Sequence, residues 1–200
     1  MKRIFIILSI TFACMQKANA QAAEIFASYS SLFATSSETV NGTKISVSDN
    51  NYGLSLGYNS LNPCFNDNCY FVIGGKLSYI WDKEESFTEN ILRLKVPASL
   101  KCKLMVGKES ALEPYAGLNA SMYMVHTVSA DNPYGSGSSS VDLFSEGELN
   151  HFTFGGHVGL DLRINNFVIG VCYEKDFTNY SSDYNTKWSS IDFKVGLRFE

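Results

Sequence analysis

The residues of this sequence that could do chemistry together are His126 and Ser129, three positions apart and followed by a Ser-rich stretch. A histidine that acts as a base can activate a serine hydroxyl, and such a pair could remove an acyl chain from an ester. A third group must orient the histidine, and Glu146 and Glu148 are the carboxylates that could reach it. The alternative is a histidine that lies beside a flexible loop and takes no part in catalysis. We favour this alternative, so the sequence predicts no catalytic residue.

Two cysteines, Cys64 and Cys69, lie in one predicted turn. Two thiols this close can form a disulfide in an oxidising compartment. Metal binding is the alternative, but two cysteines without nearby histidines supply only half of a typical site. The sequence therefore predicts a Cys64–Cys69 disulfide, no metal and no other cofactor. Cys102 and Cys172 fall on an apolar and a polar strand face, so we expect them to be buried small residues that do not pair.

The elements that position these residues follow from a pattern in the middle of the chain, between Leu92 and Leu104. Apolar residues alternate there with Arg, Lys, Ser and Pro. In a β-strand every second side chain lies on the same face, so one face of this strand is apolar and the other is largely basic. The run is longer than the roughly 5–6 residues of an average strand. It suits a tilted strand that crosses a membrane, which needs roughly 9–11 residues.

Seven other segments alternate in the same way and are separated by turn-rich stretches. The eight predicted strands cover residues 24–34, 52–58, 71–81, 92–104, 116–124, 152–164, 167–174 and 191–199. Eight antiparallel strands form the smallest usual closed barrel, so the predicted fold class is an all-β, eight-stranded, up-and-down transmembrane β-barrel. With the N-terminus in the periplasm, the predicted outer loops are 35–51, 82–90, 127–150 and 178–186. The predicted periplasmic turns are 59–69, 106–113 and 165–166.

Alternation alone does not say which face of such a barrel is outward. A soluble barrel keeps its apolar face inside, whereas a membrane barrel turns it outward to the lipid. The charged face here is rich in glycine, which a narrow lumen requires, and aromatic residues gather near strand ends, as they do at membrane interfaces. The last strand ends at Phe199, an aromatic of the kind that barrel insertion machinery reads. We therefore expect a membrane barrel, with Met122, Met124 and His126 all pointing outward.

The inward face of this barrel would carry most of the charges of the strands. They are Lys76, Arg93, Lys95, Lys101, Lys103, Asp161, Arg163, Glu174, Asp192, Lys194 and Arg198. The interior of an eight-stranded barrel is only wide enough for side chains, so we interpret these residues as a structural network that pairs across the lumen. A small anion-conducting pore is the alternative.

The first residues of the chain have the pattern of an export signal. Lys2 and Arg3 precede an apolar stretch that is too short to span a membrane, and a small-x-small site ends at Ala20. We therefore divide the chain into a signal peptide, 1–20, and a barrel, 21–200; acylation of Cys14 is a second possibility. Without the signal, 13 basic residues stand against 20 acidic ones, so we do not expect a nucleic-acid partner.

Three segments together carry a resemblance to a known family: residues 96–104 (VPASLKCKL), 113–118 (EPYAGL) and 196–199 (GLRF). Nearly all of the mature chain resembles the outer-membrane-protein beta-barrel domain family, the PorT-like members of the broad OmpA/OmpX-like group. The resemblance implies an eight-stranded barrel in the bacterial outer membrane. It implies no particular reaction, because this family shares none.

The outer loops are where we expect function, since loops on a rigid scaffold usually carry binding. Their aromatic residues, set among Ser, Asn and Asp, are Tyr134, Phe144, Tyr180, Tyr184 and Trp188. We expect an integral outer-membrane protein with a structural or surface-interaction role. The expected partners are outer-membrane lipid, the barrel insertion machinery, and an extracellular ligand or host surface. The alternatives are a lipid-modifying enzyme that uses His126 and Ser129, and a soluble periplasmic ligand-binding barrel.

Overall fold

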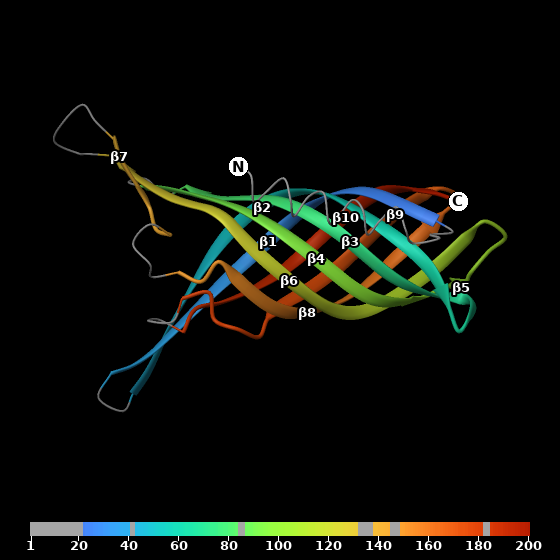
Figure 1. Ribbon diagram of the computed structural model, residues 1–200, viewed down its shortest axis with the longest axis horizontal. Helices are drawn as coiled ribbons and strands as arrows, with labels where there is room; N and C mark the ends of the chain where they lie inside the picture. The colour runs from blue at the N-terminus through green and yellow to red at the C-terminus, as the bar shows by residue number, and fades with distance from the viewer. Residues whose placement is uncertain (1–21, 41–42, 84–86, 132–137, 145–148, 182–184) are drawn as a thin grey trace.

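The described part of the chain forms ten strands, and eight of them are long. Figure 1 shows how they are arranged. The computed structural model describes residues 22–40, 43–83, 87–131, 138–144, 149–181 and 185–200. The long strands are β1 (Ala22–Val40), β2 (Thr43–Cys64), β3 (Asn66–Lys83), β4 (Phe87–Cys102), β6 (Ser110–Asp131), β8 (Phe152–Ile164), β9 (Phe167–Asp176) and β10 (Lys187–Phe199). The short strands are β5 (Leu104–Met105) and β7 (Ser138–Asp142). Within the described ranges no helix combines the length and the apolarity needed to cross a membrane.

The eight long strands close into a barrel. Each pairs antiparallel with its neighbours in the order β4-β3-β2-β1-β10-β9-β8-β6, and β6 pairs back onto β4. The first and last strands pair from Ala23↔Phe199 to Thr35↔Lys187. Closure leaves no unpaired edge along the wall, which a bilayer requires because hydrocarbon offers no hydrogen-bond partner. The predicted eight-stranded antiparallel barrel is confirmed.

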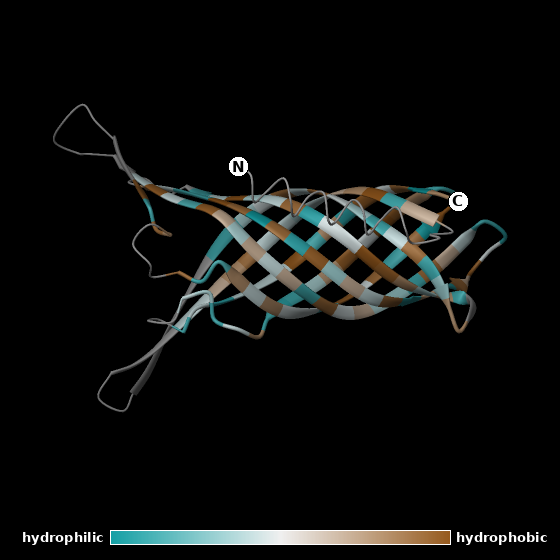
Figure 2. Cartoon of the chain, viewed as in Figure 1, coloured by the Kyte–Doolittle hydropathy of each residue, from teal (hydrophilic) through white to brown (hydrophobic). Residues whose placement is uncertain are grey.

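The wall of this barrel is apolar outside and charged inside. Figure 2 shows apolar and polar residues alternating along the strands that cross the wall. Outward-facing Leu56 and Leu118 are 69% and 65% exposed, whereas inward-facing Glu24, Glu113 and Asp161 are 0% exposed. Water does not stabilise such a wall but hydrocarbon does, so the protein is an integral barrel of the bacterial outer membrane. The alternative of a soluble periplasmic barrel is therefore wrong.

Several strands are longer than the sequence pattern predicted. Residues 35–51 were expected to be a loop, but β1 and β2 stay paired as far as Val40↔Thr43. The turn expected at 59–69 is also shorter than predicted, because β2 runs to Cys64 and β3 begins at Asn66. Phe65, between them, has a φ of 61°. Both segments are mostly polar, and the one alternation in 35–51, Ile45 and Val47 on either side of Ser46, is much shorter than those of the predicted strands. The tight turn at Asn165–Asn166 is confirmed, with Asn165 at φ 52°.

The two ends of the barrel therefore differ, and Figure 1 shows the difference clearly. At one end, here called the turn end, short connections join β2 to β3, β4 to β6 and β8 to β9. At the other, here called the loop end, the β1–β2 ribbon and the β6–β7 pair project beyond the wall. This alternation of short and long connections is typical of outer-membrane barrels.

A β-bulge reverses the facing of β6 near the loop end. Leu92 pairs with Val125 and Arg93 pairs with Tyr123, so Met124 is an extra residue without a partner on β4. One extra residue in a strand turns the following side chains to the opposite face. His126 consequently points inward and is 4% exposed. The expectation that it points outward, in phase with Met122, is wrong for this reason.

Two inward-facing glycines make room for aromatic rings inside the barrel. A Cβ at Gly57 would lie 2.3 Å from Phe26 Cζ, and one at Gly159 would lie 2.3 Å from Tyr115 Cζ. No side chain fits at either glycine while the ring stays in place. The glycine-rich inner face is thus what lets large side chains fill a narrow lumen.

We expect Leu56→Arg to weaken insertion and folding, because it places a charge in the middle of the lipid-facing wall. The cost should be about 2–4 kcal/mol in free energy of unfolding. Urea unfolding in phospholipid vesicles measures this free energy. The folded fraction at each urea concentration is read from the difference in gel mobility between unheated and boiled samples. Val106→Arg is the matched control, since Val106 is 63% exposed in the connection between β5 and β6, outside the paired strands of the wall. Equal, small effects of both substitutions would contradict a lipid-facing wall.

Candidate functional site

The middle of the lumen holds a compact cluster of ion pairs, here called the central cluster. Lys76 Nζ lies 2.5 Å from Asp192 Oδ2 and 3.3 Å from Glu174 Oε1. Lys95 Nζ pairs with the other oxygen of Glu174, and the Ser190 hydroxyl donates to the same oxygen at 3.3 Å. All of these side chains are buried. Two cations therefore face two carboxylates, and their charges cancel.

A second cluster, here called the turn-side cluster, fills the lumen toward the turn end. Asp161 Oδ2 accepts hydrogen bonds from Lys101 Nζ at 2.6 Å and from Lys194 Nζ at 2.7 Å. Glu24 Oε1 lies 2.9 Å from the Lys194 ammonium. The guanidinium of Arg198 forms a bidentate pair with Glu113, at 2.7 and 2.5 Å, and reaches Glu24 at 3.1 Å. Planar bidentate pairs of this kind are the strong ones, because two parallel bonds fix their geometry.

Arg93 lies on the loop side of the central cluster and uses an aromatic partner. Its Cζ is 5.9 Å from the centroid of the Tyr123 ring. The Tyr123 hydroxyl donates to Asp176 Oδ2 at 3.3 Å, and Thr153 donates to the same oxygen at 3.0 Å. The guanidinium is thus held by a ring face and by the field of a nearby carboxylate.

Ten of the eleven predicted lumen charges lie in these groups or directly beside them. Arg163 reaches Glu113 at 3.3 Å and Glu200 at 3.2 Å, at the turn-end rim. Lys103 is the exception: it lies half-buried after β4 and takes part in none of the ion pairs of the described lumen. The sequence reasoning missed Glu24, Glu113 and Asp176, three buried acids that help to balance the cations. They lie at or near the ends of the predicted strands. Each alternates in phase with the inward-facing residues of its strand, and this phase was the signal that could have identified them.

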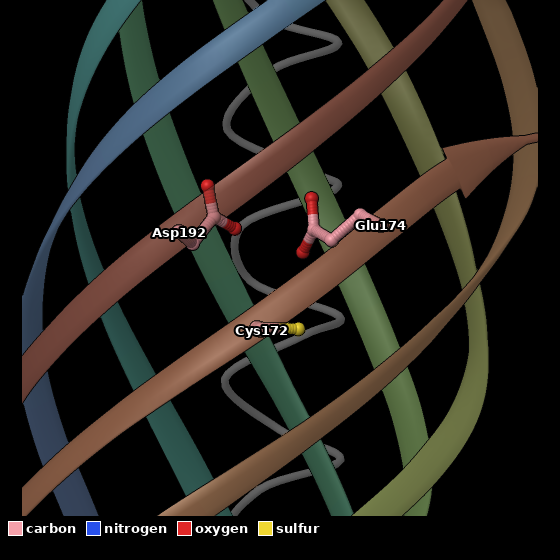
Figure 3. Close-up of side chains that lie close together, drawn as sticks. All are labelled: Cys172, Glu174 and Asp192. Carbon is pink, nitrogen blue, oxygen red and sulfur yellow. The ribbon is translucent and has the colours of Figure 1, made fainter.

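A group with the chemistry of metal ligands lies within the central cluster. Figure 3 shows Cys172 and Glu174 on β9 and Asp192 on the neighbouring β10, with the two carboxylates facing one another. One ligand atom from each of the three lies within 4.8 Å of the others. Lys76 and Lys95 already neutralise these carboxylates. A cation would have to displace two buried ammonium groups, so the arrangement fits an ion-pair network better than a metal centre.

The lumen leaves little room beside these side chains. A cavity of about 60 Å³ lies between the described side chains, lined by residues that include His157, Tyr115 and members of both clusters. Ligand pockets are usually about 300–1,000 Å³, so this space suits ordered water and no larger molecule. Unpaired buried atoms such as His157 Nδ1 and Asp192 Oδ1 offer hydrogen bonds to such water.

The loop end of the lumen is closed by a hydrophobic cluster, here called the aromatic cap. It joins inward-facing Leu32, Ala34, Ile80, Ile91 and Tyr123 to Trp188 and to Tyr180 from the β9–β10 connection. The rings of Tyr123 and Tyr180 lie 4.3 Å apart, and those of Tyr180 and Trp188 lie 6.0 Å apart. Phe144 packs on the cap from outside and stacks on His151 at 4.3 Å. The cap separates the charged lumen from the loop-end surface.

His126 is part of the polar rim of this cap. Its Nδ1 lies 2.6 Å from the Tyr180 hydroxyl, and its Nε2 pairs with Glu89 Oε1. Burial alone would raise the pKa of Glu89, but hydrogen bonds from His126 and Asn51 outweigh it and lower that pKa. Burial raises the pKa of Tyr180, which keeps its hydroxyl protonated. A carboxylate only accepts, so Nε2–H donates to Glu89, and Nδ1 shares a hydrogen bond with the Tyr180 hydroxyl.

The structure does not bring His126 and Ser129 together. Both ring nitrogens of His126 are engaged by Glu89 and Tyr180, and Ser129 pairs along the backbone with Thr88 of β4. Glu146 and Glu148 lie outside the described residues. The carboxylate that orients the histidine is Glu89, which sequence reasoning missed because it stands on a neighbouring strand.

The aromatic residues chosen as loop recognition residues have different surroundings. Tyr180 and Trp188 are 3% and 4% exposed within the aromatic cap, and Phe144 is half-buried against it. Tyr134 and Tyr184 lie outside the described residues, as does the signal peptide. Three of the five residues thus help to close the barrel, so polar neighbours in the sequence do not by themselves identify exposed rings.

The cysteines at the turn end are arranged differently from the predicted pair. Cys64 and Cys69 are both free, and Cys69 Sγ lies 3.4 Å from Cys102 Sγ. The Cys64–Cys69 disulfide stays a prediction. Cys172 is buried as expected, whereas Cys102 is exposed on the outward face.

We expect Glu174→Gln to destabilise the barrel by about 3–5 kcal/mol, because it removes the carboxylate between two buried lysines. Urea unfolding in vesicles measures the loss. Glu200→Gln makes the same chemical change at the rim, where the Glu200 side chain is 63% exposed and bonds Arg163. An exposed pair contributes about 0–1 kcal/mol, so this control should change little. A loss from Glu174→Gln no larger than that of the control would contradict the lumen network.

Comparisons with known proteins give similar barrels. The structure resembles that of Ail, the attachment invasion locus protein of Yersinia pestis, at TM-score 0.47 and 17% identity over 89% of this chain and 98% of that one. It resembles Neisserial surface protein A at TM-score 0.49 and 12% identity, over 89% and 99%. It resembles the outer membrane enzyme PagL at TM-score 0.47 and 10% identity, over 85% and 98%. No family model and no curated protein matches the sequence. At these identities the similarity concerns the barrel and does not extend to an activity.

Proposed function

We propose that this protein is a non-catalytic outer-membrane barrel whose loop end projects from the cell and recognises an extracellular ligand or host surface. The observation that supports it is the extension of β1 and β2 past the wall. Strand β10 pairs with β1 only as far as Thr35, whereas β2 accompanies β1 to Val40. The strands beyond Thr35 form a two-stranded ribbon outside the membrane. Loops and ribbons on a rigid scaffold are the usual carriers of binding.

The filled lumen supports a role outside the barrel. Seven cations of the described lumen, Lys76, Arg93, Lys95, Lys101, Arg163, Lys194 and Arg198, stand against six buried carboxylates, Glu24, Glu113, Asp161, Glu174, Asp176 and Asp192. Arg163 also pairs with the exposed Glu200 at the rim. The aromatic cap covers these charges at the loop end. A pore needs a continuous path of water, and paired side chains occupy that path here. The charges thus act as a structural core rather than as an anion channel.

The surroundings of the barrel imply two further partners. Its apolar outer wall lies against outer-membrane lipid, and stacked aromatic pairs, Tyr29–Tyr52 and Tyr79–Trp81, stand where an interfacial girdle is expected. The last strand ends at Phe199, exposed on the outer face, which suits recognition by the barrel insertion machinery.

We expect removal of the ribbon to abolish surface recognition and to leave the barrel intact. Deleting residues 37–40 and 43–46 joins the paired residues Ser36 and Val47 through the natural Asn41-Gly42 dipeptide, a sequence that favours two-residue hairpin turns, and keeps the facing of both strands. Adhesion of cells displaying the protein to immobilised host glycans and matrix proteins gives the readout. Replacing Lys108-Glu109 with Asn-Gly at the turn end is the control. Unchanged adhesion of the shortened variant would argue against the ribbon as the recognition element.

We expect His126→Ala to leave membrane lipid unchanged, because both nitrogens of His126 are engaged inside the cap. Mass spectrometry of lipid A is the measurement, on cells that carry the wild-type protein, the variant or neither. All three samples should give the same spectrum. A modified lipid A that depends on the wild-type protein and disappears in the variant would instead establish the lipid-modifying enzyme.

A further inference from the structure

Two cysteines face each other across neighbouring strands at the turn end. Cys69, near the start of β3, and Cys102, the last residue of β4, are direct Cα partners. Lys103 N donates to Asn68 O at 2.6 Å, so the adjacent residues 68 and 103 form the hydrogen-bonded pair. Cys69 and Cys102 therefore occupy a non-hydrogen-bonded position, where Cα atoms are about 4.5 Å apart and side chains approach most closely. That separation falls within the range of disulfides, about 4.4–6.8 Å between Cα atoms.

A local irregularity decides which thiol Cys69 meets. Pro63 pairs with Tyr70, so a regular hairpin would place Cys64 opposite Cys69. The register shifts after Pro63, and Cys64 pairs with Asn66 instead. Cys69 is consequently turned toward β4, with its sulfur 3.4 Å from that of Cys102.

The pair is also accessible to reagents. Cys102 continues the outward face of β4 past Leu100, and Cys69 continues that of β3 before Phe71. Cys69↔Cys102 is the first residue pair between β3 and β4 on the turn side, and β4 ends at Cys102, so the two thiols lie at the turn-end limit of this pairing. The turn end faces the periplasm when the loop end faces outward, and the periplasm is an oxidising compartment.

We propose that Cys69 and Cys102 form a disulfide that ties β3 to β4 at the periplasmic rim, with Cys64 remaining a free thiol. The oxidant is a disulfide-bonded protein of the periplasmic thiol-oxidising class. One cysteine thiolate attacks the donor disulfide and forms a mixed disulfide, which releases the first donor thiol. The second cysteine then attacks the mixed disulfide and releases the other donor thiol. Two protein thiols are oxidised and one donor disulfide is reduced.

The experiment maps the linkage in full-length protein isolated from outer membranes, with N-ethylmaleimide added at lysis. Trypsin together with a protease that cleaves before aspartate, here before Asp49 and Asp67, separates Cys64, in peptide 49–66, from Cys69, in peptide 67–76, and releases Cys102 in 102–103. Mass spectrometry without reduction should find 67–76 joined to 102–103 with the loss of two hydrogen atoms. Peptide 49–66 should carry one N-ethylmaleimide group. Peptide 67–76 joined to 49–66, or all three thiols alkylated, would overturn the proposal.

Single substitutions provide the controls. Cys64→Ser should keep the 67–76 to 102–103 linkage at the wild-type level. Cys69→Ser and Cys102→Ser should each lose it completely and leave the partner cysteine alkylated. The gel-mobility shift between unheated and boiled samples verifies that each variant still forms the barrel. A Cys64–Cys69 disulfide found both in Cys102→Ser and in the wild-type protein would overturn the proposal and support the pair within the turn.

Discussion

The rest of the structure depends on one constraint, which is that charges turned away from lipid must neutralise each other in a lumen with almost no water. The bilayer requires an apolar outer face, and strand geometry then assigns every second residue to the inside. Charges in that confined space are stable only in pairs, because an isolated buried charge is expensive. Glu174 between Lys76 and Lys95, and Arg198 between Glu113 and Glu24, satisfy this condition. The glycines that face Phe26 and Tyr115 supply the remaining space.

Much of this arrangement could be predicted from the sequence, since period-two alternation identifies both the strands and their faces. The strand over residues 152–164 was predicted with its observed bounds, and so was the turn at 165–166. The pairing partners could not be predicted, because they depend on the register between strands that are distant in sequence. Lys76 and Asp192 are 116 residues apart, and nothing in either local sequence points to the other.

The prediction failed where the backbone departs from regular alternation. A single extra residue, Met124, turns His126 from the lipid to the interior and brings it to Glu89 and Tyr180. The shift after Pro63 acts differently: it takes Cys64 away from its place opposite Cys69 and leaves Cys69 on the outward face, beside Cys102. Bulges leave little trace in composition, yet each changes which chemistry a side chain can take part in. The candidate catalytic pair and the candidate disulfide both stood next to such a position.

The aromatic cap connects the filled lumen to the surface that we expect to bind. Tyr180 comes from the connection between β9 and β10, and it packs on Tyr123 of β6 and on Trp188 of β10. Phe144, which follows β7, packs on the same group. Connections from two sides of the barrel are thereby fixed to one buried cluster before any ligand arrives. A surface held in this way loses less conformational entropy on binding than free loops would. In the function that we propose, the loop aromatics buried in the cap act indirectly, by fixing the polar residues around them.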